Sequence, residues 1–125
     1  MTEKTVVSIL ESWLKQSGWT ILWANHKRRG VDVGAEKDGQ RWFIETKGDA
    51  KNDDTANQDA SFYAALGQII AYRTDANAKY SVAFPDTARY KSRWQGLPRA
   101  ARCAVDTCLF VSATQPVSES NWSWP

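Results

Sequence analysis

The dipeptide Asp38-Gly39 lies between two strand-like runs and constrains the fold more than any other feature of the sequence. Residues 31–37 precede it and residues 40–47 follow it, and both runs contain β-branched or aromatic side chains. An Asp-Gly pair readily adopts the two positive φ angles of the tight turn that joins antiparallel strands. We therefore predict a β-hairpin whose turn fixes its register.

The register of this hairpin determines which side chains meet. Lys37 faces Gln40 across the turn, and continuing the pairing outward sets Asp32 opposite Glu45. Because side chains alternate along a strand, Lys47 projects to the same face as Glu45. Two carboxylates and an ammonium group are therefore predicted to share one end of one face.

Two facing carboxylates need a counterion. At about 5 Å and an effective dielectric constant of about 20, they repel by about 3 kcal/mol. A Mg²⁺ ion would remove this conflict, since it takes one or two carboxylates and fills its remaining positions with water and phosphate oxygens. The alternative is a surface charge cluster, which the apolar run Trp42-Phe43-Ile44 before Glu45 disfavours.

Composition narrows the class of protein. A chain of 125 residues, 42% apolar and 24% charged, fits one ordinary globular domain. No apolar run is long enough to span a membrane and no signal peptide is recognisable, so we expect a cytoplasmic protein without a membrane partner. Cys103 and Cys108 are predicted to be free thiols, and with His26 as the single histidine any metal must be held by oxygen.

Hydrophobic periodicity predicts the element order αβββαβαβ. A helix over Glu3–Gln16, capped by Thr2 and ended by Gly18, precedes a strand at 19–24, the hairpin and a polar loop at 48–57. The later elements are a central helix apolar around most of its circumference (58–73), a strand (80–84), a helix broken near Gly96 and Pro98 (86–102) and a strand (108–112). This order predicts an α/β fold with a mixed central sheet flanked by helices over residues 1–113, and a C-terminal tail at 114–125.

The sequence "GVD", followed by a turn and "FIETKG", resembles the PD-(D/E)XK nuclease superfamily. Its signature is an acidic residue, a spacer, and then an acidic residue, any residue and lysine. The resemblance covers residues 5–84 in element order and departs at Val31, where a proline often stands. It implies a restriction-endonuclease-like αβββαβ core, in the RecB-like or the Holliday-junction-resolvase and Mrr-like branch.

The resemblance also implies roles for the hairpin residues. Asp32 and Glu45 would bind Mg²⁺, or Mn²⁺ in its place, with the Thr46 backbone carbonyl as a third protein ligand. Lys47 would position or deprotonate the water that hydrolyses a phosphodiester bond, with DNA as the favoured substrate. A non-catalytic module that binds nucleic acid or protein is the alternative, and a homodimer or a larger protein partner is compatible with either function.

Gln68 and Tyr72 resemble the Gln-x-x-x-Tyr motif of RecB-like nucleases, where both residues line the active-site cleft. The alternative is a glutamine and a tyrosine that pack in the core. Glu11 is the candidate for the acidic residue that many members of the superfamily carry on the first helix, although a solvated glutamate explains it better.

Two basic clusters are candidates for nucleic-acid binding, because a net charge of only +2 requires local clustering. They are Lys27, Arg28 and Arg29 upstream of Asp32, and Arg89, Lys91 and Arg93 on the later helix. Tyr90 and Trp94 lie between and beside the second set and could stack on unpaired bases. The alternative for both clusters is a solvated basic face.

Overall fold

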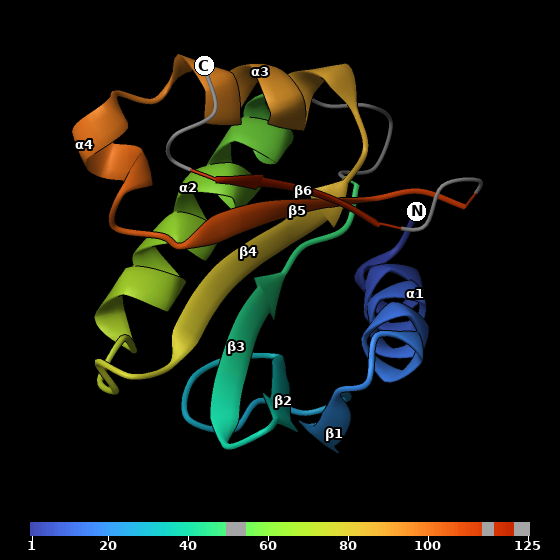
Figure 1. Ribbon diagram of the computed structural model, residues 1–125. Coiled ribbons are helices and arrows are strands. Elements are labelled where there is room, and N and C mark those ends of the chain that lie inside the picture. Colours follow the sequence, from blue (N-terminus) through green and yellow to red (C-terminus); the bar gives the residue numbers. More distant parts are fainter. Residues whose placement is uncertain (50–54, 114–116, 122–125) are drawn as a thin grey trace.

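A six-stranded mixed sheet forms the centre of the computed structural model, which describes residues 1–49, 55–113 and 117–121 (Figure 1). The strands are β1 (Thr20–Trp23), β2 (Val33–Lys37), β3 (Gln40–Thr46), β4 (Lys79–Pro85), β5 (Thr107–Val111) and β6 (Val117–Asn121), and they lie in this order across the sheet. Strands β1 to β3 form an antiparallel meander, β4 and β5 continue in parallel with β3, and β6 is antiparallel to β5.

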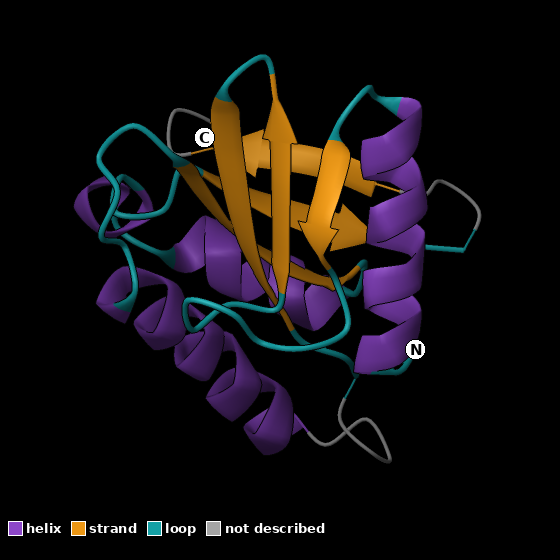
Figure 2. Ribbon diagram, turned by 90° about the horizontal axis from the view of Figure 1, so that it is seen from below, coloured by secondary structure: helices purple, strands orange, loops and turns teal. Residues whose placement is uncertain are grey.

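Helices cover both faces of the sheet, as predicted for an α/β fold (Figure 2). They are α1 (Glu3–Gln16), α2 (Thr55–Ala71), α3 (Ala88–Gly96) and the single turn α4 (Arg99–Arg102). Helix α1 packs on one face, and α2 with α3 packs on the other, so each face has its own hydrophobic core. No helix in the described part of the chain is long and apolar enough to cross a membrane.

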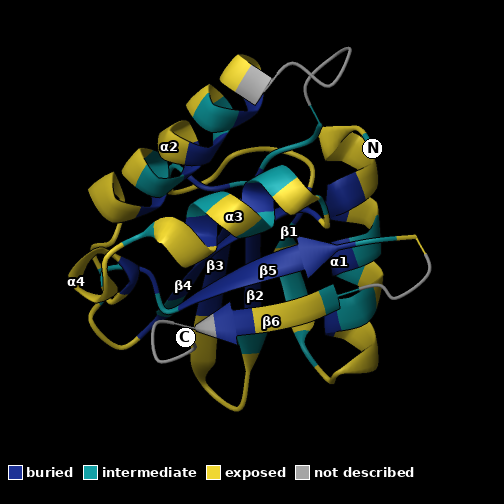
Figure 3. Cartoon of the chain, turned by 90° about the horizontal axis from the view of Figure 1, so that it is seen from above, coloured by how far each residue is buried: buried dark blue, intermediate teal, exposed yellow. Residues whose placement is uncertain are grey.

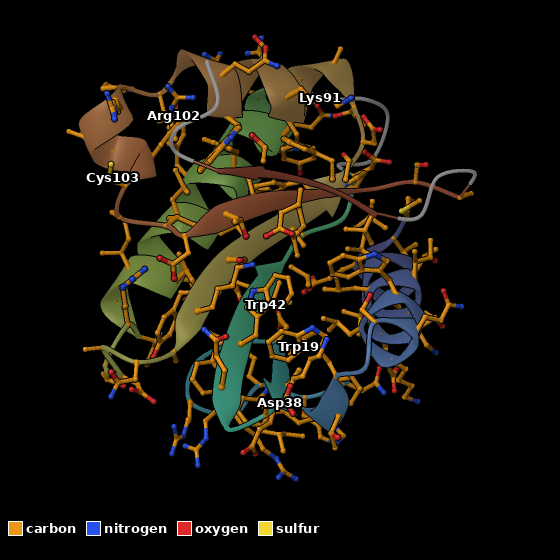
Figure 4. All side chains as sticks on the ribbon, in the orientation of Figure 1. Trp19, Asp38, Trp42, Lys91, Arg102 and Cys103 are labelled. Carbon is orange, nitrogen blue, oxygen red and sulfur yellow. The ribbon has the colours of Figure 1, made fainter. Side chains whose placement is uncertain are left out.

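Helix α1 has the predicted bounds because its capping signals are local. The Thr2 hydroxyl accepts a hydrogen bond from the Thr5 amide, and Gly18 leaves the helix with a φ of 90°. Val6, Val7, Leu10 and Leu14 form its buried stripe. On the same side of the sheet, the Trp42 ring meets Trp19 edge-on with ring centroids 5.2 Å apart (Figure 4).

The hairpin of β2 and β3 has the predicted register. Lys37 pairs with Gln40 and Val33 with Ile44, while Asp38 and Gly39 take φ angles of 52° and 81° at the tip. Both angles are those of the tight turn that an Asp-Gly pair favours. Asp32 directly precedes Val33 and Glu45 directly follows Ile44, so this register underlies the candidate site.

The predicted C-terminal tail is wrong for residues 117–121, which form the edge strand β6. Its polar sequence conceals the pairing because an edge strand needs little apolar surface. Two distant contacts fix it: Trp94 Nε1 donates a hydrogen bond to Ser120 Oγ at 3.0 Å, and Lys79 forms an ion pair with Glu119 at 2.6 Å. The other residues of the predicted tail beyond 113 lie outside the described residues.

Helix α2 differs from the prediction of a central helix that is apolar around most of its circumference. It covers one face of the sheet with a buried stripe that includes Gln58, Phe62 and Ile69, whereas Tyr63 and Ile70 are about half exposed on its outer side (Figure 3). It also begins at Thr55, within the segment predicted as a loop, whose residues 50–54 lie outside the described residues.

Candidate active site

The candidate site lies where β2 begins and β3 ends. Asp32 immediately precedes β2, and Glu45 and Thr46 are the last residues of β3. The Lys47 amide donates a hydrogen bond to the Ala83 carbonyl at 3.0 Å, which ties the exit of β3 to the parallel strand β4. The site thus stands at the carboxyl ends of two central strands.

Asp32, Glu45 and Lys27 form a compact charged group that we call the acid cluster. The Lys27 ammonium lies 2.9 and 2.8 Å from the two carboxylate oxygens of Glu45 and 3.4 Å from Asp32 Oδ1. The Glu45 side chain is only 1% exposed and that of Asp32 13%, whereas the Lys27 side chain is 49% exposed. The structure therefore brings the two predicted carboxylates together and adds a lysine that was predicted to bind nucleic acid.

The Asp32 carboxylate is held by the last residue of β3. Its Oδ2 atom accepts hydrogen bonds from the Thr46 amide at 2.9 Å and from the Thr46 hydroxyl at 3.1 Å. Burial alone would raise the pKa of Asp32, but hydrogen bonds from Glu45 and Thr46 and the charge of Lys27 hold that pKa below its usual value. Asp32 therefore loses its proton more readily than Glu45.

Glu45 has the opposite character. Burial, followed by its interaction with Asp32, raises the pKa of Glu45 to about 7, although Lys27 partly opposes the shift. For Lys27, burial would lower the pKa, but the contacts with Glu45 and Asp32 raise it above its usual value. Burial and the neighbouring Asp32 thus outweigh the effect of the Lys27 ammonium on the Glu45 carboxyl.

Glu3 is a third acidic residue beside the cluster, and it was not among the residues predicted from the sequence. Its Oε1 atom accepts a hydrogen bond from the Thr46 hydroxyl at 3.3 Å. Burial, followed by the charge of Asp32, raises the pKa of Glu3, while Lys47 lowers it. In the sequence, Gly48 is the one sign of this contact. A Cβ at position 48 would overlap the backbone of Glu3, so only glycine lets α1 begin so close to β3.

Glu11 was the predicted acidic residue of this helix, but it pairs with Lys15. The two form an ion pair of 3.3 Å one helical turn apart. Glu11 also lies eight residues beyond Glu3, which is about 12 Å along a helix. These contacts fit the alternative of a solvated glutamate.

Lys47 stands one residue beyond β3, two residues after Glu45. Its side chain is partly buried, and its charge partly opposes the rise in the pKa of Glu3. Lys27, by contrast, occupies the space between the carboxylates of Asp32 and Glu45.

Gln68 and Tyr72 support the turn that precedes Asp32. Gln68 Nε2 donates a hydrogen bond to the Gly30 carbonyl at 2.7 Å, and the Tyr72 ring fills the space that a Cβ at Gly30 would need. Trp23 Nε1 donates to the next carbonyl, that of Val31, at 3.1 Å. In this structure the two motif residues position the backbone between Lys27 and Asp32.

Arg28 and Arg29 occupy the tip of the same turn. Arg28 and Val31 exchange two backbone hydrogen bonds of 3.1 and 3.0 Å, and Arg29 and Gly30 take φ angles of 51° and 76° between them. The Arg29 guanidinium lies 5.7 Å from the centre of the Phe43 ring. Both arginines are exposed, and their contact with nucleic acid stays a prediction.

The second basic cluster is largely paired. Arg89 and Arg93 each donate two hydrogen bonds of 2.6 to 2.9 Å to the Asp59 carboxylate. We call these three residues the arginine clamp. Lys91 pairs with Asp86 at 2.7 Å, far from the hairpin tip at Asp38 (Figure 4). The clamp therefore joins α3 to α2.

The prediction that Tyr90 and Trp94 stack on bases is wrong. Both side chains are fully buried, because residues four apart on a helix share one face and this face packs on the sheet. The Tyr90 ring stacks on Phe84 at 4.6 Å, and its hydroxyl donates to the Gly48 carbonyl at 2.8 Å. Neither ring can reach a base in the folded protein.

A cleft of about 590 Å³ opens beside the acid cluster. Its lining includes Glu3, Val7, Ala24, Asn25 and Asp32, from the start of α1 and the segment after β1. Such a volume lies within the usual range for ligand sites. Asp32 is the member of the acid cluster that this cleft reaches.

The donor set at this site suits a hard cation. In residues 1–49, 55–113 and 117–121, no three His, Cys, Asp or Glu side chains are grouped closely enough to hold an ion by themselves. Asp32, Glu45 and the Thr46 carbonyl nevertheless offer oxygen ligands, and Mg²⁺ completes such a set with water and phosphate. Burial and the neighbouring Asp32 raise the pKa of Glu45 to about 7, so a bound cation would favour the ionised form of this carboxyl. Cys103 and Cys108 are free thiols and stand apart from this donor set.

Comparison with known proteins identifies structural neighbours for the whole fold. No family model matches the sequence, and no curated protein matches it. An XisH family protein from Nostoc punctiforme PCC 73102 has a TM-score of 0.66 and 23% identity, with 93% of this chain and 98% of that chain covered. An fdxN element excision controlling factor protein from Anabaena variabilis has a TM-score of 0.66 and 26% identity over 94% of this chain and 99% of that one. The chain therefore shares the fold of these two proteins over 93 and 94% of its length.

Proposed function

We propose that this protein is a Mg²⁺-dependent phosphodiesterase that hydrolyses DNA. The observation that carries the proposal is the pairing of Asp32 and Glu45 at the end of the hairpin, with Glu45 buried and its pKa raised to about 7. Lys47 follows on the same strand exit, as the acidic-any-lysine motif requires. The order of α1, the meander β1 to β3, α2 and β4 supports a restriction-endonuclease-like core for this site.

Each residue has a distinct part in the proposed reaction. Asp32, oriented by the amide and hydroxyl of Thr46, would hold the cation together with Glu45 and the Thr46 carbonyl. When bound, Mg²⁺ would supply positive charge to the phosphate and lower the pKa of water. Lys47 would orient the attacking water or accept its proton, for which its position at the edge of the cluster is suitable.

The test is a cleavage assay with Mg²⁺ on single-stranded, duplex, flapped and four-way DNA. We expect Lys47→Ala to abolish cleavage while DNA binding survives, and Lys47→Arg to be poor because a guanidinium does not readily act as a base. Lys15→Ala, an exposed lysine of α1 paired with Glu11, is the control and should keep full activity. Full activity in Lys47→Ala would refute the proposed role.

A non-catalytic nucleic-acid-binding module is the second candidate. Lys27 already neutralises one of the two carboxylates, as expected of a site that no longer needs a metal. One neighbour is described as an excision controlling factor, a name that fits regulation as well as cleavage. DNA binding without cleavage of any substrate by the parent protein would favour this candidate.

A further inference from the structure

Lys27 occupies the space that a shared cation would need. Its ammonium contacts both oxygens of Glu45 and lies 3.4 Å from Asp32, so it bridges the two carboxylates that would bind a metal ion. A cation held by both carboxylates would stand in the same place. The ammonium and a divalent ion cannot both occupy it, because charges of the same sign repel strongly at such a distance.

The Lys27 side chain can leave while its backbone stays in place. It is about half exposed, whereas the segment that follows it is fastened by side chains from other elements. Gln68 holds the Gly30 carbonyl and Trp23 holds the Val31 carbonyl. A rotation of the long, flexible side chain into solvent therefore suffices, and the turn that positions Asp32 need not move.

We propose that Lys27 is a built-in counterion that competes with the metal and is displaced when the metal binds. The inference rests on the proposed function, since it concerns the same pair of carboxylates. Lys27 keeps the metal-free site folded by supplying one positive charge, and it weakens metal binding by that same contact. Once displaced, its ammonium lies at the edge of the site, where a phosphate group of a substrate would meet it.

The first test measures Mn²⁺ binding to the full chain by electron paramagnetic resonance, without any substrate. Lys27→Met removes the charge but keeps a flexible apolar stem, and we expect Mn²⁺ to bind about tenfold tighter, the factor for removing one charge-assisted competitor. Lys91→Met is the matched control, because Lys91 is similarly exposed and also pairs with a carboxylate. Its affinity should equal that of the parent.

The other outcomes separate this inference from the proposed function. Equal Mn²⁺ affinity in the parent and in Lys27→Met would overturn the competition but leave a metal-binding site. Binding in neither protein would overturn both, because Lys27→Met should expose the site most fully. Asp32→Asn combined with Glu45→Gln should abolish the binding, and retention there would place the ion elsewhere.

A second measurement follows the parent protein itself, and Lys27→Met serves only to assign one of its signals. Reductive ¹³C-methylation labels the lysines without removing their charge, and the Lys27 signal is assigned by its absence in Lys27→Met. Addition of Mg²⁺ should move the Lys27 signal towards that of a solvent-exposed lysine and leave the Lys91 signal unchanged. Saturation of the protein with Mg²⁺ without movement of the Lys27 signal would overturn the inference.

Discussion

The molecule contains two clusters of three charged side chains in which the signs of the charges are reversed. The acid cluster places one lysine between two carboxylates, whereas the arginine clamp places one carboxylate between two guanidiniums. Glu45 is almost completely buried in the first, while Asp59 in the second is 23% exposed and both arginines are 36% exposed. The number of charges is the same, but their surroundings differ.

This difference determines what each cluster can do. The two arginines hold the pKa of Asp59 well below its usual value, so every member of the clamp is ionised and satisfied. In the acid cluster, burial raises the pKa of Glu45 to about 7 despite the neighbouring lysine. The paired cluster at the surface joins two helices, whereas the buried pair of carboxylates in the acid cluster is where we propose that a cation binds.

The largest expected effect is on the pH dependence of stability. The pKa of Glu45 is about 4.5 when unfolded and about 7 when folded, so its stabilising effect is complete below pH 4.5 and is lost as the pH rises to 7. The loss amounts to about 3 kcal/mol for a shift of this size. Urea unfolding in a buffer with chelator should show this decline for the parent and not for Glu45→Gln.

Asp59→Asn provides the contrasting control for that experiment. The pKa of Asp59 is lowered, so its stabilising effect is present above its unfolded pKa and is lost only as the pH falls below that range. Between pH 5 and 7.5 the difference between the parent and Asp59→Asn should therefore stay constant. A decline in stability of Glu45→Gln equal to that of the parent would contradict the buried character of the acid cluster.

The next effect concerns the lysine of the acid cluster. Lys27→Met leaves Asp32 and Glu45 without their common counterion, and we expect a loss of about 2 kcal/mol at pH 8 without metal, less than for a fully buried pair because Lys27 is half exposed. Lys91→Met should cost less than about 1 kcal/mol, as for other surface ion pairs. Equal losses, measured by urea unfolding, would show that both lysines form ordinary surface pairs.

How much of this comparison is predictable from the sequence depends on the range of the interactions. The pairing that leads to Asp32 and Glu45 follows from the Asp-Gly turn and strand alternation, both of which act within the hairpin. The cap of α1 at Thr2 is equally local. By contrast, the position of Glu3 depends on the close approach of the start of α1 to Gly48, which are far apart in the chain.

The unpredicted parts share this non-local origin. Lys27 reaches Glu45 because Gln68 and Trp23, from two other elements, fix the turn that follows it. Strand β6 pairs with β5 and is anchored by Trp94 and Lys79, so its own polar sequence carries little signal. The burial of Trp94 is easier to predict from the sequence. Tyr90 and Trp94 share one face of the helix, and the charged residues lie on the other sides.

The smallest expected effect concerns DNA binding, and it tests whether the arginines of the clamp are available to a ligand. A Glu45→Gln protein, chosen to prevent cleavage, is titrated with labelled duplex DNA at several salt concentrations. Each bound phosphate contributes about −0.9 to the slope of log affinity against log salt. Arg28→Ala with Arg29→Ala should make the slope shallower by about one for each phosphate that is no longer bound, because both arginines are exposed and directly follow Lys27 of the acid cluster in the chain. Arg89→Ala with Arg93→Ala should change it less, because Asp59 already binds both guanidiniums and any phosphate would have to compete with that carboxylate. A larger change from the second pair would mean that DNA binds over α3 and that the clamp opens to receive it.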